Sequence, residues 1–521
     1  MKSSTLRTFI AVHTWVGLAA GFCLFIAFYA GAVTMFHAEL HAWQTPIPPT
    51  ETATAGPRQS QTQTQTQTQA LIDAVLAVHP DVAKAFAVSL PSEHEPQLVL
   101  TAGERQFRFD AAGKVEEFEE SSHLLDFIYK LHYTAGLPVS WGLYTLGVVC
   151  VLYGLALVSG VVIYAPTFFK DLFALRIGKN LKRMWQDAHN AIGILSLPFH
   201  IMYAWSSAVL ALGLILLAPF QYLVFDGKPL ALVGADINAA APPKAAGVAA
   251  PLLPVARALA AAAHAAPEME INRLVYRAAG DANAQVQVFG SARGDTVSRN
   301  AVVVLNASSG EVLRVVTPQN YSPGTRFFRS LQALHFGNFG HAAVQWMYFI
   351  LGLAGAFLFY SGNLLWIEAR RKRLSVAQPR SGRLMAQATL GVCLGCVAGV
   401  SAMFVINKLA PAAPGQLPLW ESRGYYAVFW LAVVWAFARP PARAAHELLT
   451  LCAVLTAAIP LAHWVGTGVS PAQALMGGDG VTVGVAIVAL LAAALFWKTA
   501  RAVLDRGRHG DPHSVWALAP S

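Results

Sequence analysis

The 521-residue sequence predicts a mainly α-helical membrane protein, with about eight transmembrane helices in a bundle and two small α+β domains outside the membrane. Three observations support this prediction. Hydrophobic residues make up 55% of the chain and charged residues only 12%, about half of the usual quarter. Apolar runs long enough to cross a bilayer recur along the sequence, and two long polar segments interrupt them. This composition excludes a soluble globule, a disordered chain and a secreted disulfide scaffold.

Each predicted span is an apolar run close to the roughly 20 residues that a helix needs to cross a bilayer. The sixth run is the shortest, and Trp430, Trp435 and its flanks would have to extend it into the interfaces. The first run continues into Met35 and Phe36 without a small-residue cleavage site, so we expect a retained anchor and not a signal peptide. The runs lie at about residues 8–38, 141–165, 189–219, 342–367, 384–406, 425–438, 445–465 and 481–500.

The Lys and Arg residues of the short loops predict the orientation of the chain. With the N-terminus in the cytoplasm, 19 of the 37 Lys and Arg residues fall in cytoplasmic segments. The short loops on the other side, near 407–424 and 466–480, carry only Lys408 and Arg423. We therefore expect a bacterial inner-membrane protein with both termini cytoplasmic and two periplasmic domains. The net charge of +9 is then a signal of topology, with the lipid bilayer as the partner and nucleic acid excluded.

These spans and loops divide the chain into seven parts. They are a first transmembrane helix (1–40), a first periplasmic domain (41–140), helices 2 and 3 with a basic cytoplasmic loop (141–219), a second periplasmic domain (220–340), helix 4 (341–373), four additional helices (383–505) and a cytoplasmic tail (506–521).

Each periplasmic domain is predicted to be one helix packed on a small antiparallel sheet. Helical spacing at 70–79 and 254–266 precedes short alternating runs at 84–90, 97–101 and 105–118, and at 272–278, 284–289 and 300–316. The last run of each set turns, at Asp110–Gly113 and at Asn306–Gly310. The Gln/Thr alternation at 61–69 is interpreted as a polar linker. All five cysteines lie in spans, so no structural disulfide is expected.

The first four spans read as an internal duplication. Each half opens with His-x3-Gly, passes through an outside domain and an amphipathic segment ending in Leu-His-aromatic, and closes with Ser-Gly. A shift of 176 residues aligns Arg7 with Arg183, His13 with His189, Gly17 with Gly193 and Leu18 with Ile194. A shift of 203 residues aligns Leu124 with Phe327, Leu125 with Phe328, Ile128 with Leu331, Leu131 with Leu334, His132 with His335 and Tyr133 with Phe336. The closing pairs are Ser159-Gly160 and Ser361-Gly362.

These motifs give residues 1–373 a resemblance to the PepSY-associated transmembrane family of iron-regulated inner-membrane proteins. The openings His13-Thr-Trp-Val-Gly17 and His189-Asn-Ala-Ile-Gly193 carry it, together with the two Leu-His-aromatic segments and Leu197-Pro198-Phe199-His200. The outside modules look like PepSY domains. Because members of the family include ferric-siderophore reductases with haem b, the resemblance implies that function here. The four spans beyond residue 383 lie outside the resemblance.

Ionisable residues inside spans are candidate functional residues in their own right. His13 and His189 each follow an Arg by six residues, which puts them roughly 9 Å into the membrane. Their equivalence in the repeat favours facing positions in a bundle, where they would be the axial ligands of a haem on the cytoplasmic side. The Gly four residues after each would leave room for a flat macrocycle.

A second haem is expected near the periplasmic face, with its iron held by His132 and His335. His37 and His41 end the first span at the same level and are rival ligands. From His13 to His37 the helix would rise about 36 Å, a wide gap for electron transfer. His200 lies 11 residues beyond His189, about 16 Å deeper, and could hold an intermediate or displaced haem.

Other interpretations of these residues remain open at this point. A lone membrane histidine is often a helix–helix hydrogen-bond donor, which is the interpretation preferred for His446 and His463. The outside pair could instead hold a transported metal ion, since His suits Fe, Cu and Zn alike. Cys393-Leu-Gly-Cys396 has the spacing of metal ligands, but in an apolar helix core packing is favoured.

We expect from this a haem b-containing oxidoreductase, with two haems, that reduces ferric iron or a ferric siderophore at the periplasmic face. The cytoplasmic loops carry no flavin or nicotinamide motif, so the electron donor would be a membrane quinol or a separate cytosolic reductase. One alternative is a siderophore or metal permease whose two halves rock about a midplane site. Another is a sensor or regulatory protein that acts through its PepSY-like domains, which would leave the histidine pairs unexplained.

Overall fold

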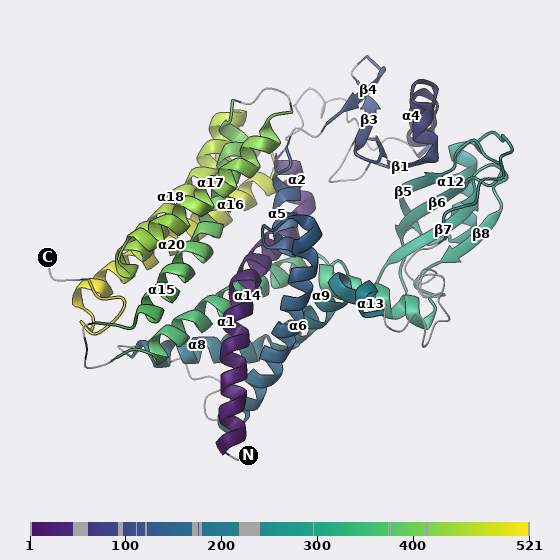
Figure 1. The fold of residues 1–521 in the computed structure, drawn as a ribbon. Coiled ribbons are helices and arrows are strands. Elements are labelled where there is room, and N and C mark those ends of the chain that lie inside the picture. The colour runs from purple at the N-terminus through teal and green to yellow at the C-terminus, as the bar shows by residue number, and fades with distance from the viewer. Residues whose placement is uncertain are drawn as a thin grey trace. The chain divides into compact units, whose positions relative to one another are not determined.

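The computed structural model describes residues 3–44, 61–91, 97–110, 112–119, 122–168, 176, 180–217, 240–294, 296–372, 375, 377–411 and 415–518. They belong to two compact units (Figure 1). The first unit is helical and comprises Met1–Thr45, Ser121–Gly213 and Ala342–Ser521. The second contains an antiparallel sheet and comprises Pro46–Glu120 and Leu214–His341. The chain therefore enters the second unit twice, with the two segments that the sequence places outside the membrane.

The first unit is built from long apolar helices joined by short connections. A 3₁₀ turn, Thr34–Phe36, connects α1 to α2, and a π-helical turn, Leu390–Leu394, connects α15 to α16 within one 30-residue span. The α-helices are α1 (Ser3–Val33), α2 (His37–Gln44), α5 (Leu124–Thr134), α6 (Val139–Tyr164), α8 (Leu181–Leu195), α9 (Leu197–Leu217), α14 (Ala342–Ala369), α15 (Arg380–Thr389), α16 (Gly395–Leu409), α17 (Leu417–Ala438), α18 (Pro441–Thr467), α19 (Pro471–Met476) and α20 (Gly480–His509).

Within the described residues, six helices are long and apolar enough to cross a membrane, and α8 with α9 makes a seventh span if counted together. This agrees with a multi-pass membrane protein. The predicted sixth span corresponds to α17, which has 22 residues and is not among the six. Glu421 and Arg423 lie in its first half and lower its hydropathy.

The third predicted span, 189–219, is not one continuous helix. It consists of α8 and α9, which meet at Ser196 with a bend of 70°. Pro198 explains the break, because proline disfavours helical geometry in the residue before it and has no N–H to donate. The expectation that His200 lies a straight 16 Å beyond His189 is therefore wrong, since the two histidines belong to differently directed helices.

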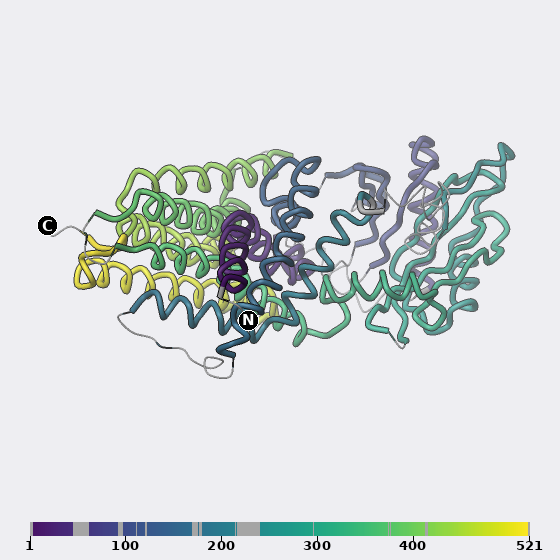
Figure 2. The backbone as a smooth tube through the Cα atoms, turned by 60° about the horizontal axis from the view of Figure 1, so that its bottom comes forward, coloured from purple at the N-terminus to yellow at the C-terminus, as the bar shows by residue number. Residues whose placement is uncertain are grey.

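The last four long helices pack on one another and on the first helices of the chain. Figures 1 and 2 show the green-to-yellow helices α16 to α20 side by side. Their shared core joins side chains of α1 and α5, such as Ile26 and Ile128, to Met403 of α16 and Tyr425 of α17. The buried Glu421 carboxylate accepts hydrogen bonds from the Ser122 hydroxyl and the His123 N–H. This extension is thus an integral part of the first unit.

The second unit contains one continuous antiparallel sheet in which the two predicted modules are merged. Its strand order is β4-β3-β2-β1-β5-β6-β7-β8. The first strand of each module pairs with the other, in the register Phe86 opposite Tyr276 and Val88 opposite Leu274. The expectation of two separate small sheets is therefore wrong. The strands are β1 (Ala85–Ser89), β2 (Val99–Ala102), β3 (Arg105–Phe109), β4 (Val115–Phe118), β5 (Glu270–Arg277), β6 (Gln285–Ser291), β7 (Asn300–Asn306) and β8 (Val312–Val316).

The helices α4 (Gln61–Val78) and α12 (Val255–Ala265) share one hydrophobic core with the sheet. Alternate residues of neighbouring strands line up on this face, as Leu274, Val288 and Val303 do in register. All three are fully buried, which is what a period of two predicts for the covered face of a sheet. A third helix of this unit, α13 (Pro323–Phe336), contains the second Leu-His-aromatic motif.

The Gln/Thr run at 61–69 forms the first half of α4, so its interpretation as a linker is wrong. The threonine hydroxyls donate back to carbonyls one turn earlier, as Thr68 does to Thr64 at 2.7 Å. The Thr68 side chain is fully buried, and the Gln69 carboxamide oxygen accepts the Val255 N–H at the start of α12. Tertiary contacts with α12 therefore stabilise a helix whose composition alone favours disorder.

Both predicted turns are present. The Asp110 carboxylate accepts the N–H groups of Ala112 and Lys114 between β3 and β4, and Gly113 has a φ of 77°. The Asn306 side chain does the same between β7 and β8, and Gly310 has a φ of 81°. Left-handed backbone at these glycines explains why each run reverses where it does.

Replacing Gln69 with alanine should loosen α12. The Val255 N–H would lose its only acceptor among the described residues, a change worth about 1 kcal/mol. In hydrogen exchange of the full chain, we expect the first amides of α12 to exchange about fivefold faster. Gln65→Ala is the control, because Gln65 is on the same helix and its side chain makes no hydrogen bond among the described residues. Equal acceleration of amide exchange in both variants would contradict the capping role.

Candidate functional site

His13 on α1 and His189 on α8 lie together in the first unit. Their ring centroids are 6.1 Å apart and their planes make an angle of 82°. The two residues are 176 positions apart in sequence, so only the folded bundle brings them into contact. This is the pair that the internal repeat placed on facing helices.

The His13 ring is held by α6. Its Nδ1 lies 2.9 Å from the Ala156 carbonyl oxygen, and because a carbonyl can only accept, Nδ1 carries the proton. The buried Ser159 hydroxyl lies 3.0 Å from the same carbonyl oxygen and 2.8 Å from the Leu155 carbonyl oxygen, between which its one proton is shared. Gly160, one turn after Ala156, provides the space, since a Cβ there would lie 3.0 Å from His13 Cε1. We call such a carbonyl with a glycine four residues later a histidine seat.

His189 occupies an equivalent seat on α14. Its Nδ1 donates to the Leu358 carbonyl oxygen at 3.1 Å, and the Ser361 hydroxyl donates to the same oxygen. A Cβ at Gly362 would lie 3.3 Å from His189 Cε1. In both seats Nδ1 is committed to the backbone, so Nε2 is the nitrogen that carries the lone pair able to bind a metal.

His132 occupies a third seat, which α1 provides. Its Nδ1 donates to the Ala27 carbonyl oxygen at 2.8 Å, and a Cβ at Gly31 would lie 2.6 Å from the same nitrogen. This seat has no serine, because the residue three positions after Ala27 is Ala30. The three seats use the same chemistry to orient three imidazoles within one helical unit.

His200 is held differently, because both of its ring nitrogens have side-chain partners. The Tyr153 hydroxyl donates to Nδ1 at 2.6 Å, and Nε2 lies 2.9 Å from the Ser196 hydroxyl. That hydroxyl already donates to the Ile192 carbonyl, so Nε2 must be the donor to Ser196. His200 is fully buried in an aromatic cluster centred on Phe28. It would have to exchange a hydrogen bond before it could bind a metal.

The other predicted ligands do not form a comparable pair within one unit. His37 and His41 stack on each other one turn apart in α2, with ring centroids 6.1 Å apart. His335 belongs to the second unit, where it is buried and its ring contacts Phe336 at 5.3 Å. The pairing of His132 with His335 stays a prediction, because the two residues are parts of different units.

The separation of the His13 and His189 rings suits two imidazoles that would both bind one haem iron. Two imidazole nitrogens that bind one metal ion at about 2 Å each place their ring centroids on the order of 6 Å apart. A Cβ at Gly17 would meet nothing within 4 Å, and one at Gly193 only Leu358 Cδ1 at 3.6 Å. The described residues contain no group of three or more His, Cys, Asp or Glu side chains that could hold a bare metal ion.

In the extension, His446, His463, Cys393 and Cys396 are packing residues. His446 on α18 donates from Nδ1 to the Ala500 carbonyl of α20 at 3.0 Å, which is the helix–helix role that the sequence predicted. His463 stacks on Trp43 with ring centroids 5.3 Å apart. Cys393 and Cys396 are buried free thiols in the helical core.

Sequence reasoning identified the histidines but not the groups that orient them. Ser159, Gly160, Ser361 and Gly362 were recognised only as the closing motif of each half. The only signal in the sequence was that the same Ser-Gly pair closes both halves of the repeat. Tyr153, the partner of His200, had no such signal, because its role depends on the bend at Ser196.

The sequence profile of a family described as "PepSY-associated TM region" matches residues 10–369. A relative from Pseudomonas aeruginosa, "Uncharacterized protein PA4219", is 28% identical over 344 residues, which cover 62% of this chain and 84% of the relative. The family match includes all three histidine seats and ends before α15, so the extension lies outside it.

Replacing Tyr153 with phenylalanine should destabilise the first unit. The variant keeps the ring but leaves the buried Nδ1 of His200 without its donor, at a cost of about 1–3 kcal/mol. We expect a lower thermal midpoint for the full chain in detergent. Tyr144→Phe, on the same helix at a half-exposed position, should leave the midpoint unchanged; a similar fall in both would show that the hydrogen bond is not responsible.

Proposed function

The chain belongs to the PepSY-associated TM region family, and from this premise we propose that it is a haem b-containing inner-membrane oxidoreductase. It passes electrons to the periplasmic side and reduces ferric iron or a ferric siderophore there. The observation that carries the proposal is the His13–His189 pair, with ring centroids 6.1 Å apart and both Nδ1 atoms bonded to backbone.

The two seats hold His13 and His189 in the tautomer and orientation that a metal-binding histidine needs. Each Nδ1–H hydrogen bond fixes the tautomer and the ring orientation, which is the arrangement that metal-binding histidines generally have. Ser361 donates to the Leu358 carbonyl, and Ser159 lies within hydrogen-bond distance of the Leu155 and Ala156 carbonyls, so each serine restrains the helix turn that holds a ring. Haem bound at this site would supply reversible one-electron chemistry. The surrounding apolar helices would exclude water from it.

A second haem is proposed at His132 and His335, with His37 as the rival ligand. The partly buried His132 is oriented by its seat on α1, as His13 is by its seat on α6. His200 and the aromatic residues around Phe28 lie in the same bundle as both seats, between helices α1, α6 and α9. In the proposal this cluster fills the interior of the membrane between the two haem levels with polarisable rings, and His200 keeps its internal hydrogen bonds.

The finer topology also belongs to the proposal. In the proposal the chain has eight spans, if α17 and the bent pair α8 and α9 are each counted as one, and the first four spans are an internal duplication. Both termini are cytoplasmic and the sheet unit is periplasmic. The distribution of Lys and Arg supports this orientation, because they gather in the segments at one end of the spans. In the proposal the second unit is the part that meets the substrate, as a docking surface, and it also contributes His335 to the second haem.

The reaction needs an electron donor on one side and iron(III) on the other. Each ferric ion takes up one electron and becomes iron(II), whose lower charge weakens its bonds to oxygen ligands and releases the metal. A membrane quinol or a cytosolic reductase would supply the electrons. The contributions of this chain are ligation, orientation and exclusion of water.

The proposal predicts a haem b spectrum that depends on two residues. The purified chain, expressed with sufficient haem, should show a Soret band and an α-band after reduction with dithionite. His13→Ala and His189→Ala should each lose most of the haem of this site. His446→Ala is the matched control, since His446 also bonds a carbonyl through Nδ1 but lies in the extension.

Absence of these bands in the native protein would remove the proposal and favour the permease. Unchanged haem content in both histidine variants would show that the pairing is wrong. Reduction of ferric siderophores by the dithionite-reduced protein is then the separate assay that identifies the substrate.

A further prediction concerns the glycine of the first seat. Gly160→Ala places a Cβ about 3.0 Å from His13 Cε1 and should displace the ring, lowering haem affinity on the order of 10–100-fold. Gly154→Ala on the same helix meets nothing within 4 Å and should bind haem normally. Equal affinity in the two variants, measured by haem titration, would mean that the seat does not position His13.

A further inference from the structure

The extension has a pocket at the end of the first unit where α17 ends and α18 begins. Its volume is about 660 Å³, within the range of small-molecule sites. All of its lining residues lie between 377 and 515, beyond the part of the chain that matches the family. The lining includes Arg383, Gln387, Phe437, Arg439, Ser514 and Val515.

The pocket is cationic. It is lined by two arginines and by no Asp or Glu. Arg439 donates to both Glu447 carboxylate oxygens, at 2.6 and 3.1 Å. Arg383 is exposed, and its guanidinium has no hydrogen-bonded partner among the described residues. An arginine held at a pocket wall with its five N–H donors unused is suited to a phosphate or carboxylate group.

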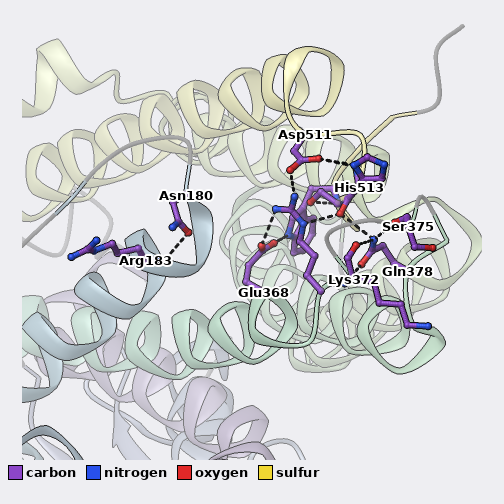
Figure 3. A network of polar contacts seen from close by, with 11 residues as sticks. Asn180, Arg183, Glu368, Lys372, Ser375, Gln378, Asp511 and His513 are labelled. Atoms are coloured by element: carbon purple, nitrogen blue, oxygen red, sulfur yellow. Dashed lines mark hydrogen bonds and ion pairs between the residues drawn. The ribbon is translucent and has the colours of Figure 1, made fainter.

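One wall of the pocket is the C-terminal tail, and a polar network fixes it in place. Arg371 binds Asp511 and donates from Nε to the His513 carbonyl at 2.7 Å, and Gln378 donates to the same carbonyl. Figure 3 shows Asp511, His513 and Gln378 converging with Glu368 at this point. The His513 N–H and Arg371 hold the pKa of the Asp511 carboxyl below its usual range. Ser514 and Val515 are therefore held at the pocket by their neighbours.

Exposed apolar side chains lie at the pocket and next to its lining residues. Phe437 lines the pocket and is 45% exposed, and Leu384, next to Arg383, is 41% exposed. Val434, one turn before Phe437 on α17, is also exposed. In a membrane these side chains would contact acyl chains at the level where the arginines meet head groups. The site thus has the two faces of an amphiphile.

We propose that this pocket binds the phosphate head group of an anionic phospholipid, with Arg383 as the main contact and the acyl chains along Leu384 and Phe437. Basic pockets between transmembrane helices are the usual sites of such lipids. Arginine binds phosphate through charge-assisted hydrogen bonds, and Gln387 is committed to the carbonyls of Phe437 and Arg439, so it shapes the pocket without competing for the ligand. The pocket is lined by residues of the extension and its neighbouring segments, so lipid binding there does not require haem at the histidine seats.

The test uses the full chain in a neutral detergent. Cardiolipin, phosphatidylglycerol, phosphatidylcholine and inorganic phosphate are added separately, with thermal midpoint and lipid retention in native mass spectrometry as readouts. We expect the two anionic lipids to raise the midpoint and to be retained, and phosphatidylcholine to do neither. Arg383→Gln should weaken cardiolipin binding roughly tenfold. Arg423→Gln, an exposed arginine in the first half of the same helix as Phe437, should leave it unchanged.

Three outcomes would overturn the proposal. They are equal stabilisation by phosphatidylcholine, unchanged cardiolipin binding in Arg383→Gln, and an equal loss in Arg423→Gln. Saturation by inorganic phosphate alone, with no further gain from lipid, would assign the pocket to a soluble phosphate compound instead. Because Arg383 is exposed and has no partner among the described residues, its replacement should leave the fold intact.

Discussion

The first unit depends on one requirement, which is that a buried imidazole N–H must have an acceptor. Inside a bundle of apolar helices the nearest acceptors are backbone carbonyls of the neighbouring helix, each of which keeps a second lone pair after binding its own helical N–H. In the seats of His13, His189 and His132 the residue one turn later is glycine. A Cβ there would lie 2.6 to 3.3 Å from ring atoms. Histidine positions and helix spacing therefore constrain each other.

Helix α1 connects these constraints. It presents His13 to α6 and offers its own Ala27 carbonyl to His132. It also packs closely on α14, where a Cβ at Gly355 would lie 2.4 Å from Phe28. Phe28 in turn contacts His200 and Tyr153. A shift of α1 against its neighbouring helices would thus disturb the seats of His13 and His132 and the aromatic cluster together. The position of this helix therefore sets the orientation of these imidazoles.

The second unit is shaped by a different constraint, which is that two separate short sheets would have four edge strands with unpaired backbone groups. Exposed edge strands offer free N–H and C=O groups to other chains. Pairing β1 with β5 removes one edge of each module and creates a common core under α4 and α12. At β4, one of the two edges that remain, Glu117 accepts hydrogen bonds from Arg105, which lower the pKa of that carboxyl, and Arg108 pairs with Glu116. Charged pairs of this kind discourage strand addition.

The sequence by itself determined the class of the protein, most of the spans, the helix and strand content of the outside segments and the pairing of His13 with His189. Apolar runs, a period of two and the repeat of His-x3-Gly are patterns within short stretches of sequence. They can be recognised without knowing which distant residues are in contact. The turns at Asp110–Gly113 and Asn306–Gly310 belong to this group, since side-chain hydrogen bonds within a few residues define them.

Only the tertiary structure decided the helical state of 61–69, the fusion of the two sheets and the partners of each imidazole. These depend on contacts between residues far apart in sequence. Gln69 meets Val255, Val88 meets Leu274, and Tyr153 meets His200. A glutamine-rich segment becomes helix, and an edge strand becomes a central one, because the partner that satisfies its backbone or buries its side chains is supplied by the other half of the chain.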